Sequence, residues 1–323
     1  MTVGRVLVTA QVVGDAVARL REAGHVVVFR DIDAPMPRDE FLAALPGVDA
    51  LVAMLVDRVD AEALDAAGPG LRVVANVAVG YDNVDVAACR ERGVLVTNTP
   101  GVLTDVTADI AMSLILMSTR GLGAAERRVR TGEPWRWSLT AHLGVGLRGK
   151  SLGIVGPGAI GLATARRAKA FGMEVLLAGR ASPDAAVVGE LDAAVVDLDE
   201  LLTASDVVSL HCPLTPATRH LIGARELRLM RPGAHLVNTS RGPVVDEAAL
   251  VAALEAGEIA GAGLDVFEDE PQVHPGLLGR EDVVLLPHVG SATGETRTAM
   301  ADLAVANVLA VLAGGEPVTP VGG

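Results

Sequence analysis

A glycine-rich turn is the first part of the chain whose residue types point to chemistry. Gly156, Gly158 and Gly161 form the pattern G-x-G-x-x-G, between an aliphatic run at 152–155 and a helical stretch at 162–171. The first glycine of such a pattern permits a tight turn, the second lets the backbone approach a pyrophosphate, and the third lets the helix pack on the strand. Free N–H groups at the start of the helix then favour the phosphates. The turn predicts a dinucleotide site formed by Gly156, Gly158, Ala159, Ile160 and Gly161.

The alternative is a glycine-rich turn that binds nothing, and the strand that follows weighs against it. A second strand is expected at 174–178, as in a dinucleotide-binding unit. NAD enzymes usually carry Asp or Glu where this strand ends, to bind the ribose 2′-hydroxyl. Here Gly179 and Arg180 follow, then Ser182, with no carboxylate. Arginine and serine suit a 2′-phosphate, so we expect NADP(H) to be favoured. If Arg180 is merely solvated, NAD(H) remains possible.

Five further segments follow one another in a specific order. They are Asn76–Asp85, Asn98–Gly101 with Thr107–Asp109, Asn238–Gly242, Gly263–Pro271 and Pro287–Thr293. With the glycine-rich turn they cover nearly the whole chain. In these segments the sequence resembles the D-isomer-specific 2-hydroxyacid dehydrogenase family, above all its glyoxylate and hydroxypyruvate reductases. The resemblance implies a soluble nicotinamide-dependent oxidoreductase that reduces a small 2-keto acid to a D-2-hydroxy acid.

Three side chains in these segments have the types that such a reduction needs. A cation must hold the substrate carboxylate and polarise the ketone, which suits the guanidinium of Arg241. The developing alkoxide needs a proton, and His288 is the natural general acid because histidine titrates near neutral pH. Glu270 would pair with His288, orient its ring and favour its protonated form. Each of the three could instead be structural, but their places after strand ends and the resemblance favour a catalytic triad.

The resemblance implies further contacts to the substrate and the cofactor. The backbone amides of Val79 and Gly80 would hold the substrate carboxylate, and Ala78 stands where the family often has Ser or Gly. Because this loop acts through its backbone, we expect Ala78 to have little effect. The cofactor contacts implied are Thr239 and Asp265 for the nicotinamide end, with Asp265 at the carboxamide, Pro213 for the adenine side, and Gly290. Thr107 could equally serve to start a helix.

The elements that must position these residues alternate along the chain. Aliphatic runs separated by helical stretches predict βαβ units and parallel sheets. The expected strands are 6–9, 26–29, 50–54, 72–75 and 94–97, then 152–155, 174–178, 206–210, 235–238, 261–264 and 283–286. The expected helices include 15–22, 39–45, 104–131, 162–171 and 293–312.

Two such series joined at a long helix predict two doubly wound α/β domains. A flavodoxin-like substrate domain is expected at 1–98, completed by 289–323, and a Rossmann dinucleotide-binding domain at 99–288. We expect a cleft between them to close over the substrate and exclude water. The tail at 314–323 is rich in Gly and Pro and is expected to be loosely held.

Composition limits the partners and the compartment. The net charge of -13 argues against nucleic acid and anionic membranes as partners. Cys89 and Cys212 are too few and too distant for a disulfide framework or a metal site, so we expect reduced thiols in a cytoplasm and no metal. Trp135 and Trp137 stand in a polar segment and predict an interface anchor or a lid. In the resembling family this region belongs to the dimer interface, so we expect a homodimer.

Two rival functions remain open at this point. One is a dinucleotide-sensing protein without catalysis, like the transcriptional corepressors of the same family, although no peptide-recruiting extension is recognisable. The other is an inorganic-anion dehydrogenase, of the phosphite type, on the same scaffold. Among keto acids, the sequence does not rank glyoxylate, hydroxypyruvate, pyruvate or longer substrates.

Overall fold

The computed structural model describes residues 3–180 and 183–322, and its contacts divide the chain into two units. Unit 1 comprises Met1–Leu103 with Ser291–Gly323, and unit 2 comprises Thr104–Gly290. These divisions fall at 103/104 and 290/291, whereas the sequence predicted 98/99 and 288/289. Ser182, predicted to contact the cofactor, lies outside the described residues.

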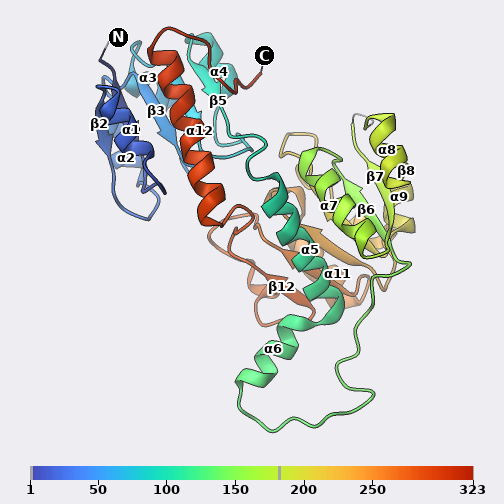
Figure 1. Ribbon diagram of the computed structural model, residues 1–323. Helices are drawn as coiled ribbons and strands as arrows, with labels where there is room; N and C mark the ends of the chain where they lie inside the picture. The colour runs from blue at the N-terminus through green and yellow to red at the C-terminus, as the bar shows by residue number, and fades with distance from the viewer. Residues whose placement is uncertain (1–2, 181–182, 323) are drawn as a thin grey trace. The chain divides into compact units, whose positions relative to one another are not determined.

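Unit 1 is built on a five-stranded parallel sheet (Figure 1). Its strands are β1 (Arg5–Val8), β2 (Val26–Phe29), β3 (Ala50–Ala53), β4 (Val73–Asn76) and β5 (Leu95–Thr97). Its helices are α1 (Ala16–Glu22), α2 (Arg38–Ala44), α3 (Ala61–Ala67), α4 (Val86–Glu91) and α12 (Gly294–Leu312). The spatial order β2-β1-β3-β4-β5 is that of a flavodoxin-like doubly wound sheet, as predicted.

Alternating side chains place two cores on the two faces of this sheet. In β1, Val6 and Val8 pack with α1 and α12, whereas Leu7 packs with α2 and α3 on the other face. The same alternation recurs in β3 and β4. Because both faces of the sheet are covered, the residues that point to either face are apolar. The strand sequences are therefore continuous aliphatic runs. This is why the strands were visible in the sequence.

Unit 2 contains a seven-stranded parallel sheet in the order β12-β11-β10-β9-β6-β7-β8. Its strands are β6 (Ser151–Val155), β7 (Glu174–Ala178), β8 (Ala194–Val195), β9 (Val207–Leu210), β10 (His235–Asn238), β11 (Gly261–Leu264) and β12 (Val283–Leu285). Its α-helices are α5 (Thr104–Arg120), α6 (Leu122–Arg130), α7 (Ala159–Ala170), α8 (Ala185–Leu191), α9 (Leu198–Ala204), α10 (Ala224–Leu229) and α11 (Glu247–Ala256), and its 3-10 helices are η1 (Gly242–Val244) and η2 (Pro275–Leu277). The order reverses between β6 and β9, as in a Rossmann fold.

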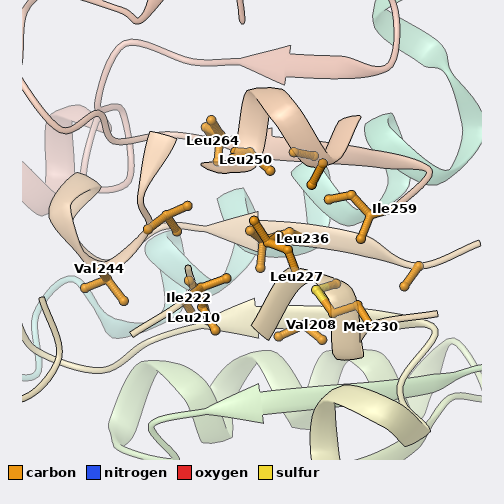
Figure 2. Packing of buried hydrophobic residues seen from close by; sticks show 14 of the residues in the cluster. Val208, Leu210, Ile222, Leu227, Met230, Leu236, Val244, Leu250, Ile259 and Leu264 are labelled. Atoms are coloured by element: carbon orange, nitrogen blue, oxygen red, sulfur yellow. The ribbon is translucent and has the colours of Figure 1, made fainter. Parts of the chain in front are cut away.

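Aliphatic side chains fill both faces of this sheet as well. On one face the strands pack against α9, α10 and α11, and Figure 2 shows Leu236 at the centre of that cluster with Leu210 and Leu264 from the flanking strands. On the other face α5, α7 and α8 cover Ile154 and Val237. Large aliphatic residues therefore do the packing that aromatic residues do in other cores.

The predicted strands are all present, with ends that differ by at most one residue. The two-residue strand β8 was missed: it lies in the short apolar run 193–196, and both its residues are exposed at the edge of the sheet. Helix α7 starts at Ala159 instead of residue 162, since Gly158 is its extended N-cap and the end of the glycine-rich turn is already helical.

The predicted long helix at 104–131 is wrong, because the chain breaks it at Gly121. This residue has a φ of 59°, in the left-handed region that glycine adopts without strain. It ends α5 and begins α6, a helix with no buried residue. In Figure 1, α6 and the loop after it extend away from the sheet of unit 2.

The prediction of a loosely held tail is also wrong. The N–H of Val321 donates to the carbonyl of Val96 at 2.8 Å, and the hydroxyl of Thr319 donates to the carbonyl of Asn98 at 2.6 Å. The N–H of Thr319 donates to the side chain of Asn307 in α12 at 2.9 Å. The tail is thus tied to the edge strand β5 and to the last helix, through polar groups that a count of Gly and Pro does not reveal. No helix within residues 3–180 and 183–322 has the length and apolar character needed to cross a membrane.

Candidate active site

A glutamate–histidine pair lies where the strands of the unit 2 sheet end. His288 follows β12, Glu270 follows β11, and His288 Nδ1 is 2.8 Å from Glu270 Oε2. The other Glu270 oxygen accepts a hydrogen bond from the N–H of Phe267 at 3.0 Å, which fixes the carboxylate in one orientation. Both side chains remain partly exposed, 26% for His288 and 30% for Glu270. The ring is therefore oriented from one side and accessible from the other.

The carboxyl group of Glu270 is held in its ionised form. Burial raises its pKa, but the hydrogen bond and charge of His288, the amide of Phe267 and the charge of Arg241 outweigh burial and leave the pKa below its usual value. With Glu270 ionised, Nδ1 of His288 is the donor in their hydrogen bond. Nε2 is then the ring nitrogen left to exchange a proton with a substrate.

The backbone of His288 is strained, and Asp265 holds it. His288 has a φ of 54°, which side-chain-bearing residues adopt rarely. Its N–H donates to the carbonyl of Asp265, and the Asp265 carboxylate accepts the N–H groups of Val289 and Gly290, all at 2.8 Å. Burial raises the pKa of Asp265, against these amides and the charge of His288. Asp265 thus fixes the segment that carries the histidine.

Arg241 lies at the end of the neighbouring strand, β10. Its main-chain carbonyl accepts from the Asn238 amide at 2.9 Å, and its guanidinium donates to the carbonyl of Ser240 at 2.9 Å. A Cβ on Gly242 would meet the carbonyl of Phe267 at 1.8 Å. The arginine segment therefore lies directly on the segment that carries Glu270. The three residues of the predicted triad come from three adjacent strand ends of one unit.

The glycine-rich turn fits a dinucleotide in two respects. Gly156 has a φ of 90° and a Cβ there would lie 2.6 Å from the N atom of Cys212, while a Cβ on Gly161 would lie 2.5 Å from the carbonyl of Gly156. Both glycines are thus required by packing. Gly158 is different, because a Cβ there would meet no atom within 4 Å. The space above Gly158 is what a pyrophosphate would fill.

The first turn of α7 offers donors to that space. Among the described residues, no group accepts a hydrogen bond from the N–H of Ala159, Ile160 or Gly161. Thr239, after β10, has a buried hydroxyl with no partner in the described part of the chain. An unpaired buried hydroxyl is costly, so Thr239 suits the cofactor contact that the family resemblance predicts.

The remaining cofactor predictions are placed as follows. Gly179 and Arg180 are exposed at the end of β7, and Arg180 has no ion-pair partner in 3–180 or 183–322. Pro213 follows β9, and its carbonyl accepts from the hydroxyl of Thr218 at 2.6 Å. Thr107 lies inside α5, not at its start, and its hydroxyl donates to the carbonyl of Gly290 at 3.1 Å.

At the carboxyl edge of the unit 1 sheet, three successive carbonyls are tied back to the protein. The carbonyl of Ala78 accepts from the N–H of Thr99 at 3.0 Å, that of Val79 from the Asn98 side chain at 2.8 Å, and that of Gly80 from the Asn76 side chain at 2.8 Å. In a trans peptide the carbonyl and the following N–H point in opposite directions.

These bonds turn the N–H groups of Val79, Gly80 and Tyr81 away from the sheet. None of them donates to a group in the described ranges. Three such amides can receive an anion. The sequence had suggested Val79 and Gly80 through resemblance, but missed the asparagines behind them. Asn98 and Asn76 were part of the quoted segments, yet nothing in their spacing shows that their amides hold carbonyls.

Comparisons with known proteins agree with this geometry. Residues 112–290 match the family model described as D-isomer specific 2-hydroxyacid dehydrogenase, NAD binding domain. The chain belongs to the D-isomer-specific 2-hydroxyacid dehydrogenase family. A glyoxylate reductase of Thermococcus litoralis is 47% identical over 97% of this chain and 95% of its own.

Solved structures of the family have the same fold. A glyoxylate reductase from Paecilomyes thermophila superposes with a TM-score of 0.90 at 35% identity, covering 100% of this chain and 99% of its own. An NADPH-dependent glyoxylate/hydroxypyruvate reductase from Sinorhizobium meliloti, in complex with NADP and malonate, has a TM-score of 0.87 at 37% identity over 99% and 97%. As a 2-hydroxyacid dehydrogenase, the protein is an oxidoreductase that acts on CH–OH donors with a nicotinamide dinucleotide. The predictions of fold, family and enzyme class are confirmed.

The pair of Glu270 and His288 predicts a pH effect. Since Glu270 is ionised, its charge stabilises the protonated histidine that keto-acid reduction consumes. In Glu270→Gln, where a neutral amide replaces the carboxylate beside the ring, kcat/KM for reduction should fall off at a lower pH than in the wild type. Glu226→Gln is the control, because Glu226 is also held ionised by local hydrogen bonds but caps α10. Identical pH profiles for Glu270→Gln and the wild type would show that the two side chains are not coupled.

Proposed function

We propose that the protein reduces glyoxylate, hydroxypyruvate or a similarly small 2-keto acid to the D-2-hydroxy acid, with Arg241, Glu270 and His288 as its catalytic residues. The observation that carries this proposal is the hydrogen bond between His288 and the ionised Glu270, beside the arginine segment. His288 thus supplies a proton donor and Arg241 a cation, at adjacent strand ends. The named relatives act on glyoxylate or hydroxypyruvate and support the choice of substrate class.

The residues of the site divide the work of the reaction. When bound, the reduced nicotinamide supplies the hydride that forms the new C–H bond at the keto carbon. Arg241 would hold the substrate carboxylate and polarise the ketone. Nε2 of His288 would give its proton to the oxygen as charge develops there, leaving a neutral ring whose Nδ1 stays bonded to Glu270. The amides of Val79 and Gly80 would bind the carboxylate.

For the cofactor, we propose a preference for NADP(H), with NAD(H) still accepted. Gly179 provides no carboxylate to bind the ribose hydroxyls or to repel a 2′-phosphate, and Arg180 is an exposed cation at the same place. The nucleotide itself would lie over Gly158, with its phosphates on the amides of Ala159 and Ile160. The relative from Sinorhizobium meliloti is NADPH-dependent, which supports this preference.

We propose a homodimer that works in the cytoplasm. Trp135 and Trp137 are 62% and 77% exposed. Further exposed apolar side chains lie along α6 and its following loop, namely Leu122, Val129, Leu139 and Leu143. Exposed apolar side chains gathered in one segment favour an interface, and a second copy is the partner we propose. Cys89 and Cys212 are buried free thiols, which suits a reducing compartment.

Arg241 is tested by substitution. Arg241→Ala should lower kcat/KM for the keto acid by about 10³-fold, since it removes both carboxylate binding and carbonyl polarisation. Arg241→Lys should keep part of the activity at a raised KM, because a point charge replaces a planar fork. Arg228→Ala, at an exposed position of α10, is the control. Wild-type kinetics in Arg241→Ala would exclude Arg241 from the site.

Cofactor preference is tested at the end of β7. Arg180→Ala should raise KM for NADPH by about 5-fold and leave KM for NADH unchanged, the effect of losing one exposed ion pair. Gly179→Asp should shift preference toward NADH, by repulsion of the 2′-phosphate and a new ribose contact. A wild type that prefers NADH, with Arg180→Ala altering neither constant, would refute this proposal.

Assembly is tested by mass in solution. Light scattering at micromolar concentration should give twice the 33.1 kDa of one chain. The double variant Trp135→Glu/Trp137→Glu should shift the mass toward the monomer, because two charges would be buried in the interface. A monomeric wild type would contradict the dimer, and a dimeric double variant would place the interface elsewhere.

A further inference from the structure

The side chain of Asn83 contacts none of the three free amides of the loop at 78–81 in unit 1. Its Nδ2 atom is 3.1 Å from the carbonyl oxygen of Met54, 3.0 Å from that of Asp57 and 3.1 Å from Oδ1 of Asn76. Three acceptor oxygens around one atom define it as the NH₂ group of the amide. Asn83 is therefore a donor that joins its own segment to two others, the segment at 54–57 and the end of β4.

Asn76 connects Asn83 to the loop through a second hydrogen bond. Its Oδ1 accepts from Asn83, which leaves its Nδ2 to donate to the carbonyl of Gly80 at 2.8 Å. Asn76 is fully buried at the end of β4, so its amide has no water to replace these partners. If Asn83 were absent, the Asn76 amide could rotate and release the carbonyl of Gly80. The orientation of the Gly80–Tyr81 peptide thus depends on a residue two positions beyond it.

The segment that accepts the other two hydrogen bonds of Asn83 is itself held in place. The segment at 54–57 is held by the Asp57 carboxylate, which accepts from the N–H of Met54 at 2.7 Å and from the hydroxyl of Thr9 after β1. The main-chain carbonyl of Asn83 also accepts from the N–H of Val59 at 2.9 Å. The Asn83 side chain therefore connects the segment after β3 and the end of β4, and Asp57 ties that segment in turn to Thr9 after β1.

We propose that Asn83 is a positioning residue for substrate binding: acting through Asn76, it fixes the Gly80–Tyr81 peptide and so sets the affinity of the unit 1 amides for the substrate carboxylate. This inference rests on the proposed role of Val79 and Gly80. Asn83 contacts no group that takes part in proton or hydride transfer. Its loss should weaken carboxylate binding and leave the chemical step of a bound substrate nearly unchanged.

The test compares Asn83→Ala and Asn83→Leu with Leu64→Ala. None of these substitutions changes the charge, and Leu64 is a buried residue of α3 in the same unit, so its loss lowers stability without touching the loop. Both Asn83 variants should raise KM for the keto acid about 10-fold. Saturating kcat and KM for NADPH should stay within about 3-fold. Leu64→Ala should lower the melting temperature and leave KM unchanged.

A second measurement identifies the route through Asn76. If Asn83 acts only by orienting Asn76, the double variant Asn76→Ala/Asn83→Ala should have the same KM as Asn76→Ala alone. Additive effects would overturn the route. An unchanged KM in both Asn83 variants, or a loss confined to kcat, would overturn the positioning role itself.

Calorimetric binding of oxalate separates this inference from the proposed function. Oxalate presents a carboxylate without being reduced, so its affinity reports carboxylate binding by the amides and Arg241 apart from the chemical step, and only the contribution of the amides should change in Asn83→Ala. If the wild type reduces no 2-keto acid, the proposed function fails, and the oxalate Kd of Asn83→Ala still decides the role of Asn83. A Kd raised about 10-fold supports it, and an unchanged Kd overturns it.

Discussion

The convergence of parallel strands at one edge is the constraint on which the whole protein depends. In unit 2, β10, β11 and β12 are neighbours, so the segments that follow them must meet. Arg241, Glu270 and His288 lie in these three segments. The segments are then fixed against one another by close backbone packing at Gly242 and by Asp265, which accepts hydrogen bonds from two amides. The buried carboxylate of Asp265 and the strained backbone of His288 are tolerated because the segments at this sheet edge hold both.

The two units present anion-binding amides by different means. In unit 2 the free amides of Ala159, Ile160 and Gly161 come from the start of a helix, where backbone geometry alone leaves them without partners. In unit 1 the amides at 79–81 belong to a loop, and they are turned outward because the N–H of Thr99 and two asparagine side chains hold the preceding carbonyls. This second arrangement depends on the asparagine side chains at 76, 83 and 98, which makes it sensitive to substitutions that a helix start would tolerate.

Much of this could be predicted from the sequence, for a physical reason. Strands covered on both faces become aliphatic runs, and a phosphate-binding turn requires glycine at fixed positions, so both are visible locally. The triad residues are recognisable because few side chains can carry a proton or bind a carboxylate. Other features depend on tertiary partners. Gly121 could have been a tolerated helix glycine, and Thr319 holds the tail only because Asn98 and Asn307 lie beside it. The role of Asn83 is invisible for the same reason.

The most direct test of the account is the fate of the hydride. The wild-type enzyme is mixed with hydroxypyruvate and NADPH carrying deuterium at both C4 positions, and the product is analysed by mass spectrometry and chiral chromatography. The account predicts D-glycerate with one deuterium on C2, formed in step with the loss of NADPH absorbance. L-glycerate, or intact NADPH with hydroxypyruvate and glyoxylate alike, would contradict it.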